Sequence, residues 1–160
     1  MHTLLYTESQ PMLGMAIVIL IIAALLVFVI YQLKKKTRTA RILSVVALVM
    51  GGILLSILVT LRLETKYYTN TVEYQFGSVY MAPPEIVSLD SVASVSIITY
   101  NPTADYGGWG VRHNETTKVY NADGDKGIIF TFKSGKKLLL GTQQPDVLKA
   151  KLTGHYPLTN

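Results

Sequence analysis

The residues that could bind an anion lie on both sides of one predicted turn. Lys133, Lys136 and Lys137 surround Ser134-Gly135, where one strand-like run ends and the next begins. Clustered lysines attract phosphate or carboxylate groups through their charge. The simpler interpretation is a solvated turn, because charged residues at the end of a hairpin are ordinarily exposed. Both interpretations of the three lysines stay open.

A second group of candidate residues lies in the glycine-rich segment 106–112. Tyr106 and Trp109 could belong to a recognition surface, because aromatic rings are common at binding interfaces. The simpler interpretation places Trp109 in the core or at a membrane interface. Arg112 could contact a ligand, or it could pair with a buried acid or carbonyl group.

No arrangement typical of an enzyme, a metal site or a nucleotide site is present in the sequence. There is no cysteine, and the three histidines (His2, His113 and His155) have no suitably spaced nucleophile or metal ligand. The segment NADGD at 121–125 matches only a fragment of a calcium-binding loop and predicts a turn. We therefore predict a non-enzymatic protein that needs neither a cofactor nor a metal.

The distribution of charge argues against a nucleic-acid partner. The chain has a net charge of +5. Residues 1–66 hold seven lysines and arginines against two acids, which accounts for all of it. Residues 67–160 hold eight of each sign and are neutral, so their field does not favour a polyanion.

Two apolar runs predict a hairpin of membrane helices. Residues 12–31 contain no charge and no proline, and twenty helical residues span a bilayer core of ~30 Å. A second run follows, and we predict helices over about 12–31 and 42–63. The pair Gly51-Gly52 could allow close approach of the first helix, although glycine is simply common in membrane helices.

The loop between these helices, residues 34–41, is strongly basic. Its charged residues are Lys34, Lys35, Lys36, Arg38 and Arg41. A short basic loop is typical of the cytoplasmic side of a membrane, and it could also bind anionic lipid headgroups. If the loop is cytoplasmic, the rest of the chain after the second helix lies on the exterior or periplasmic side.

From Tyr67 onward the sequence is typical of a small, mostly β domain. We predict about seven short antiparallel strands that form a strongly bent sheet or partly open barrel, and one C-terminal helix that covers an opening. The clearest local prediction is a hairpin around Ser134-Gly135. The predicted strands span 67–76, 79–82, 92–100, 108–113, 117–122, 127–133 and 136–141, and the helix spans 145–152. The chain thus divides into a membrane hairpin, 1–66, and a β domain, 67–160.

Several motifs in this order resemble a bacterial family of small membrane proteins that carry a pleckstrin-homology-like (PH-like) domain after two membrane helices. The matching residues are Glu8-Ser9-Gln10, Asn101-Pro102, Tyr106-Gly107-Gly108-Trp109-Gly110, Arg112, Tyr120-Asn121, Gly124, Gly127, Gly141-Thr142-Gln143 and Pro145. The resemblance covers most of the chain and is most specific at 100–148.

The resemblance implies a PH-like fold with a membrane anchor, and a domain on the cytoplasmic side, opposite to the side that the charge count predicts. It implies no known activity. Many PH domains bind phosphorylated lipid headgroups through a basic hairpin, but the arginine and tyrosine that normally accompany it are absent around Lys133, Lys136 and Lys137. Residues 113–117 replace a glycine-rich turn of the family pattern, and 77–85 also depart from it.

Three hypotheses about function follow. The first is a membrane-tethered interaction or scaffolding domain that binds a protein partner. The second is binding or sensing of anionic lipid headgroups through the basic loop and the hairpin lysines. The third is a structural membrane component that associates with itself. All three place the protein in a bacterial inner or cell membrane with more than one crossing.

Overall fold

The computed structural model describes residues 3–12, 15–35, 37–77 and 83–159, and it contains two compact units. A helical unit comprises Leu13–Leu61, and a sheet unit comprises Met1–Met12 together with Arg62–Asn160. The sheet unit therefore takes chain from both sides of the helices. This division differs from the boundary expected at residues 66 and 67, because a strand that precedes the helices pairs with one that follows them.

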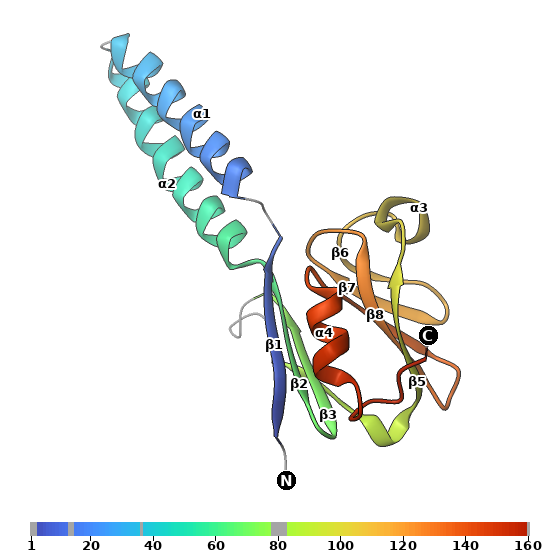
Figure 1. Ribbon diagram of the computed structural model, residues 1–160. Coiled ribbons are helices and arrows are strands. Elements are labelled where there is room, and N and C mark those ends of the chain that lie inside the picture. The colour runs from blue at the N-terminus through green and yellow to red at the C-terminus, as the bar shows by residue number, and fades with distance from the viewer. Residues whose placement is uncertain (1–2, 13–14, 36, 78–82, 160) are drawn as a thin grey trace. The chain divides into compact units, whose positions relative to one another are not determined.

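The helical unit consists of α1 (Met15–Lys34) and α2 (Arg38–Thr60), which pack side by side (Figure 1). The Thr37 hydroxyl accepts a hydrogen bond from the Ala40 amide at 3.1 Å, which satisfies a free donor at the start of α2. For this reason α2 begins at Arg38 rather than near residue 42. Most of the expected basic loop is consequently helical, since Lys34 ends α1 while Arg38 and Arg41 lie in the first turn of α2.

Close packing between the two helices occurs at Gly51. A Cβ atom at Gly51 would lie 2.7 Å from Leu25 Cδ1, whereas one at Gly52 would meet nothing within 4 Å. Gly51 therefore leaves space for the leucine of α1, as one of the two interpretations of the glycine pair predicts. Ser44 and Thr60 donate their hydroxyl groups to backbone carbonyls of α2, so neither breaks the helix.

In the described part of the chain, one helical segment is long and apolar enough to cross a membrane. It spans Arg38–Ile57 in α2, while the comparable segment of α1, Val18–Gln32, is shorter. Most side chains of α2 are exposed within the unit. By length and composition alone, a single crossing segment is indicated.

The first sheet is antiparallel and contains four strands in the order β1-β2-β3-β4. Their bounds are Leu4–Pro11, Arg62–Tyr68, Thr71–Phe76 and Glu85–Ser88. The single strand expected at 67–76 is wrong, because the chain turns at Thr69-Asn70 between β2 and β3. The strand expected at 79–82 lies outside the described residues.

The second sheet contains five strands in the order β5-β8-β9-β7-β6. Their bounds, in chain order, are Val92–Thr99, Gly110–His113, Thr117–Asn121, Lys126–Phe132 and Lys137–Gly141. All pairs are antiparallel except β7 and β9, which run parallel. The hairpin predicted around Ser134-Gly135 is confirmed, with Gly135 at φ 84° and its amide bonded to the Phe132 carbonyl.

The core lies between the two sheets and beneath the helix α4 (Pro145–Leu152). Leu148 and Leu152 of this helix are fully buried, whereas Val147 is 44% exposed. Nine strands, rather than about seven, are present in the described chain, together with a short helix α3 (Pro102–Tyr106). The fold therefore combines helices with two β sheets, and the finer comparison with a PH-like barrel stays a prediction.

Candidate functional site

A cavity of about 430 Å³ lies where the β6–β7 and β8–β9 turns come together. We call it the basic cavity. Its apolar lining comes from Tyr74, Phe132 and Leu138, and its basic lining from the side chains His113, Lys118, Lys136 and Lys137. The arrangement is a partly apolar depression with cations around it, which suits a ligand that is both apolar and negatively charged.

The two turns are held in place by local hydrogen bonds. Asn114 Oδ1 accepts from the amides of Thr116 and Thr117 at 3.1 and 2.8 Å, which closes the β6–β7 turn. The amide of Lys137 then donates to the Thr116 carbonyl at 2.8 Å and ties this turn to the start of β9. The lysines at the cavity therefore project from a fixed backbone.

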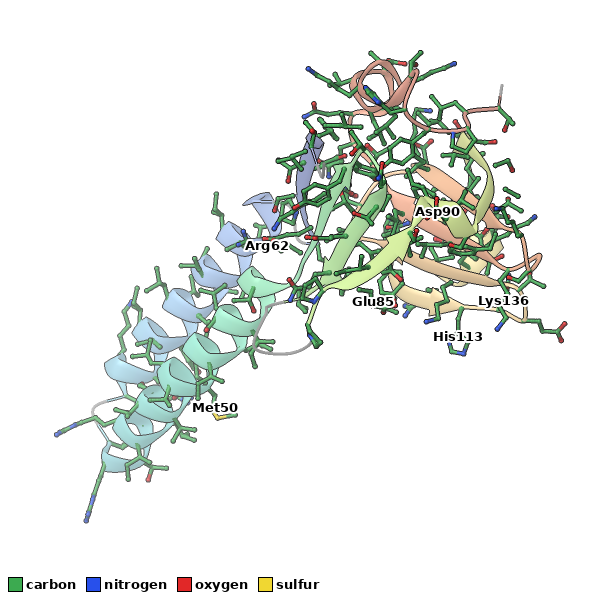
Figure 2. The ribbon with its side chains drawn as sticks, turned by 90° about the horizontal axis from the view of Figure 1, so that it is seen from below. Met50, Arg62, Glu85, Asp90, His113 and Lys136 are labelled. Atoms are coloured by element: carbon green, nitrogen blue, oxygen red, sulfur yellow. The ribbon has the colours of Figure 1, made fainter. Side chains whose placement is uncertain are left out.

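A carboxylate held by two tyrosines lies beside the basic cavity. Tyr74 and Tyr120 donate their hydroxyl groups to the two oxygens of Glu85 at 2.8 and 2.7 Å. The tyrosine rings pack with their centroids 4.8 Å apart, and Lys118 Nζ lies 3.8 Å from Glu85 Oε2. These contacts join β3 and β4 of the first sheet to β7 of the second. In Figure 2, Glu85, His113 and Lys136 lie along the same side of the sheet unit.

The hydrogen bonds fix the protonation of this group. Partial burial raises the pKa of Glu85, but the bonds from Tyr120 and Tyr74 and the charge of Lys118 outweigh it, so the pKa is lowered. Burial and the adjacent carboxylate raise the pKa of Tyr120 to about 12, and they raise that of Tyr74 as well. At neutral pH both tyrosines are therefore donors, and neither can serve as a base.

Glu85→Gln is expected to remove a pH-dependent part of the stability. The folded-state pKa of Glu85 is depressed, so its stabilising contribution is present above the unfolded pKa of 4.5 and is lost as pH falls below it. Above pH 5 the variant should be less stable by about 1 kcal/mol, a typical net hydrogen-bond value. The difference in stability between the variant and the original chain should disappear toward pH 3, as measured by thermal melts of the full chain.

Glu115→Gln, in the exposed β6–β7 turn, is the control for this measurement. It removes the same charge without breaking a bond to tyrosine, so its stability should differ from that of the original chain by a small amount. A constant difference between Glu85→Gln and the original chain from pH 3 to pH 7 would contradict the assignment.

A buried polar cluster attaches β1 to the end of β9. Glu8 is 8% exposed, and its two oxygens accept from Thr142 Oγ1 and from the Gln143 amide, both at 2.7 Å. Gln10, fully buried, donates to the Gly141 carbonyl at 2.7 Å. Two segments quoted for the family resemblance, Glu8-Ser9-Gln10 and Gly141-Thr142-Gln143, are thus in direct contact. We call this group the β1 polar cluster.

The other predicted site residues lie away from the basic cavity. Tyr106 is half-buried and packs edge-on against Tyr100, Trp109 is exposed, and the exposed Arg112 donates to the neighbouring Val111 carbonyl. Lys133 does not line the cavity, although Lys136 and Lys137 do. The exposed residues Lys34, Lys35, Arg38 and Arg41 belong to the helical unit, and Lys36 lies outside the described residues.

Among the described residues, no group of three histidine and acidic side chains is placed to hold a metal ion. Comparisons with family models, curated proteins and solved structures find no match. The resemblance to the PH-like family therefore stays a prediction.

Sequence reasoning missed several residues of the site. They come from three strands: Tyr74 from β3, Glu85 from β4, and both Lys118 and Tyr120 from β7. Their contacts depend on how the two sheets pack. One usable signal was present: tyrosines at the inward positions of two strands need polar partners for their hydroxyl groups when they are buried.

Proposed function

We propose that this chain is a membrane-anchored, non-enzymatic binding domain that captures an acidic and partly apolar segment of a partner protein. The observation that carries the proposal is the basic cavity. Lys118, Lys136 and Lys137 supply three positive charges around it. Against these stand the negative charges of Glu115 in the lining and of Glu85 beside Lys118, so the cavity keeps a positive balance. Its apolar walls favour a peptide side chain over a purely polar anion.

The pairing of β1 with β2 supports a two-helix membrane anchor. β1 precedes α1 and β2 follows α2, and the two strands pair from Leu4–Tyr68 to Pro11–Arg62. A chain that crossed the bilayer only once between them would leave these strands on opposite sides, where they could not pair. Together with the apolar composition of both helices, this favours an even number of crossings.

Binding of a labelled acidic peptide tests the proposed ligand class. The full chain is reconstituted in nanodiscs of neutral lipid and titrated with a fluorescent peptide of alternating glutamate and leucine. Lys136→Glu combined with Lys137→Glu should weaken binding about tenfold or more, equal to ~1.4 kcal/mol. Binding to the original chain should weaken as salt rises.

Lys149→Glu combined with Lys151→Glu is the matched control. It makes the same change in net charge on the exposed face of α4, outside the basic cavity. Equal losses in the two double variants would show that only net charge matters, and would contradict the proposal. Peptide affinity that is indifferent to salt would contradict it too.

A second candidate function is binding of anionic lipid headgroups by the helical unit. The observation that favours it is the exposure of Lys34, Lys35, Arg38 and Arg41 around the turn between α1 and α2. Each basic residue near an anionic surface contributes about 1 kcal/mol. Native mass spectrometry of the detergent-solubilised chain with added anionic lipid would detect it. Lipid retention unchanged by Arg38→Gln and Arg41→Gln would argue against it.

A further inference from the structure

Two large apolar side chains, two residues apart in the chain, are exposed on the sheet unit. Trp109 is 42% exposed and Val111, in β6, is 46% exposed. Trp109 is the only tryptophan of the chain. Exposed large apolar side chains of this kind often mark an interaction surface.

The backbone holds Trp109 in this exposed position. Gly108 and Gly110 on either side have φ angles of 115° and 102°, a region that other residues rarely adopt. The indole N–H donates to the Gly124 carbonyl at 3.1 Å, so its polar edge is satisfied while part of the ring stays open. The backbone conformation and this hydrogen bond therefore hold the indole ring in its exposed position.

Met12, the last residue of the sheet unit before the helices, packs against this part of the sheet unit. A Cβ atom at Gly110 would lie 3.8 Å from Met12 Cε, so Met12 packs beside the segment 109–111 within the sheet unit. The apolar helix α1 begins at Met15, three residues later. The segment 109–111 therefore packs against the residue from which the chain continues toward α1.

A cation lies beside the glycines that flank Trp109. The guanidinium of Arg112 comes within 3.7 Å of a Cβ built at Gly110 and 3.9 Å of one built at Gly108, so it folds back toward the tryptophan segment. An indole ring, an aliphatic side chain and an arginine match the zones of a membrane surface. There, tryptophan prefers the headgroup level and arginine pairs with phosphate.

We propose that Trp109 and Val111 insert into the interfacial layer of the bilayer, with Arg112 at the headgroup phosphates, and so hold this edge of the sheet unit on the membrane surface. The inference rests on the membrane anchor of the proposed function, but not on the ligand of the basic cavity. The occupant of the exposed patch is lipid, because the chain enters an apolar helix three residues after Met12.

The single tryptophan makes a direct test possible. The full chain is reconstituted into vesicles of ordinary phosphatidylcholine or of its brominated form, whose bromine atoms quench indole at short range. We expect a blue-shifted emission, loss of most of the intensity in brominated vesicles, and little quenching by aqueous iodide. A water-like emission that iodide quenches and brominated lipid does not would overturn the inference.

Two paired substitutions separate a local effect from a general one. Val111→Asp should sharply reduce quenching by brominated lipid, whereas Ile86→Asp, at a 63% exposed residue of β4, should leave it unchanged. Equal effects of the two variants would contradict the inference. Extraction of the same vesicles with alkaline carbonate tests the membrane anchor separately. Release of the protein would contradict both the anchor and the inference. Retention of the protein without quenching of Trp109 by brominated lipid would contradict the inference alone.

Discussion

Replacing Glu8 with alanine is expected to lower the free energy of unfolding of the sheet unit by about 3 kcal/mol. Two short hydrogen bonds to the carboxylate are lost, and Thr142 Oγ1 and the Gln143 amide lose their acceptor in a buried environment. A bond to a charged group contributes about 1.5–3 kcal/mol, and unpaired buried donors add a further cost. Urea denaturation of the full chain in detergent, followed by the fluorescence of Trp109, measures the change.

Ser9→Ala is the matched control, on the same strand and at an exposed position. It should change stability by about 0.5 kcal/mol or less, as is usual for exposed residues. Thr142→Val should reproduce part of the Glu8→Ala loss, because it removes one of the two donors and keeps the shape. An effect of Glu8→Ala no larger than that of Ser9→Ala would mean that the β1 polar cluster does not stabilise the unit.

Cysteine labelling across the membrane is expected to give an all-or-none pattern. Because β1 pairs with β2, cysteines introduced at Leu4 and at Ser134 should be labelled on the same side of the membrane, and one at Thr37 on the other. All three positions are exposed, and the chain has no cysteine of its own. Intact cells treated with an impermeant thiol reagent give the pattern, and permeabilised cells should label all three.

The pattern also decides on which side the sheet unit lies. Labelling of Leu4→Cys and Ser134→Cys alone would support the exterior side that the positive charges predict. Labelling of Thr37→Cys alone would support the cytoplasmic side that the family resemblance implies. Different results at Leu4 and Ser134 would contradict the two-crossing anchor, since β1 and β2 could not then share a sheet.

Local signals in the sequence were enough to predict the helices and the hairpin β8–β9. Long apolar runs identify α1 and α2, and Ser134-Gly135 identifies the turn between two apolar strands. β1 was not predicted, because its partner β2 lies beyond both helices. Its buried positions also carry Glu8 and Gln10, so the usual alternation of apolar and polar residues is missing.

The candidate site was predictable only in part, for the same reason. Lys136 and Lys137 could be found, because they flank a turn that the sequence defines. Lys118 and Glu85 could not, because they meet only after the two sheets have packed. Residues near a turn can be located from the sequence, whereas residues brought together by packing cannot. For this reason Lys136 and Lys137 were found, and Lys118 and Glu85 were missed.

The separation of β1 from β2 also imposes an order on biosynthesis. Residues 4–11 leave the ribosome before α1, and their partner emerges only after α2 has been made. The first sheet therefore cannot be completed until both helices have been synthesised. An unpaired strand awaiting its partner risks aggregation. Glu8 and Gln10, on the face that later becomes buried, make that face less apolar than an ordinary buried strand face.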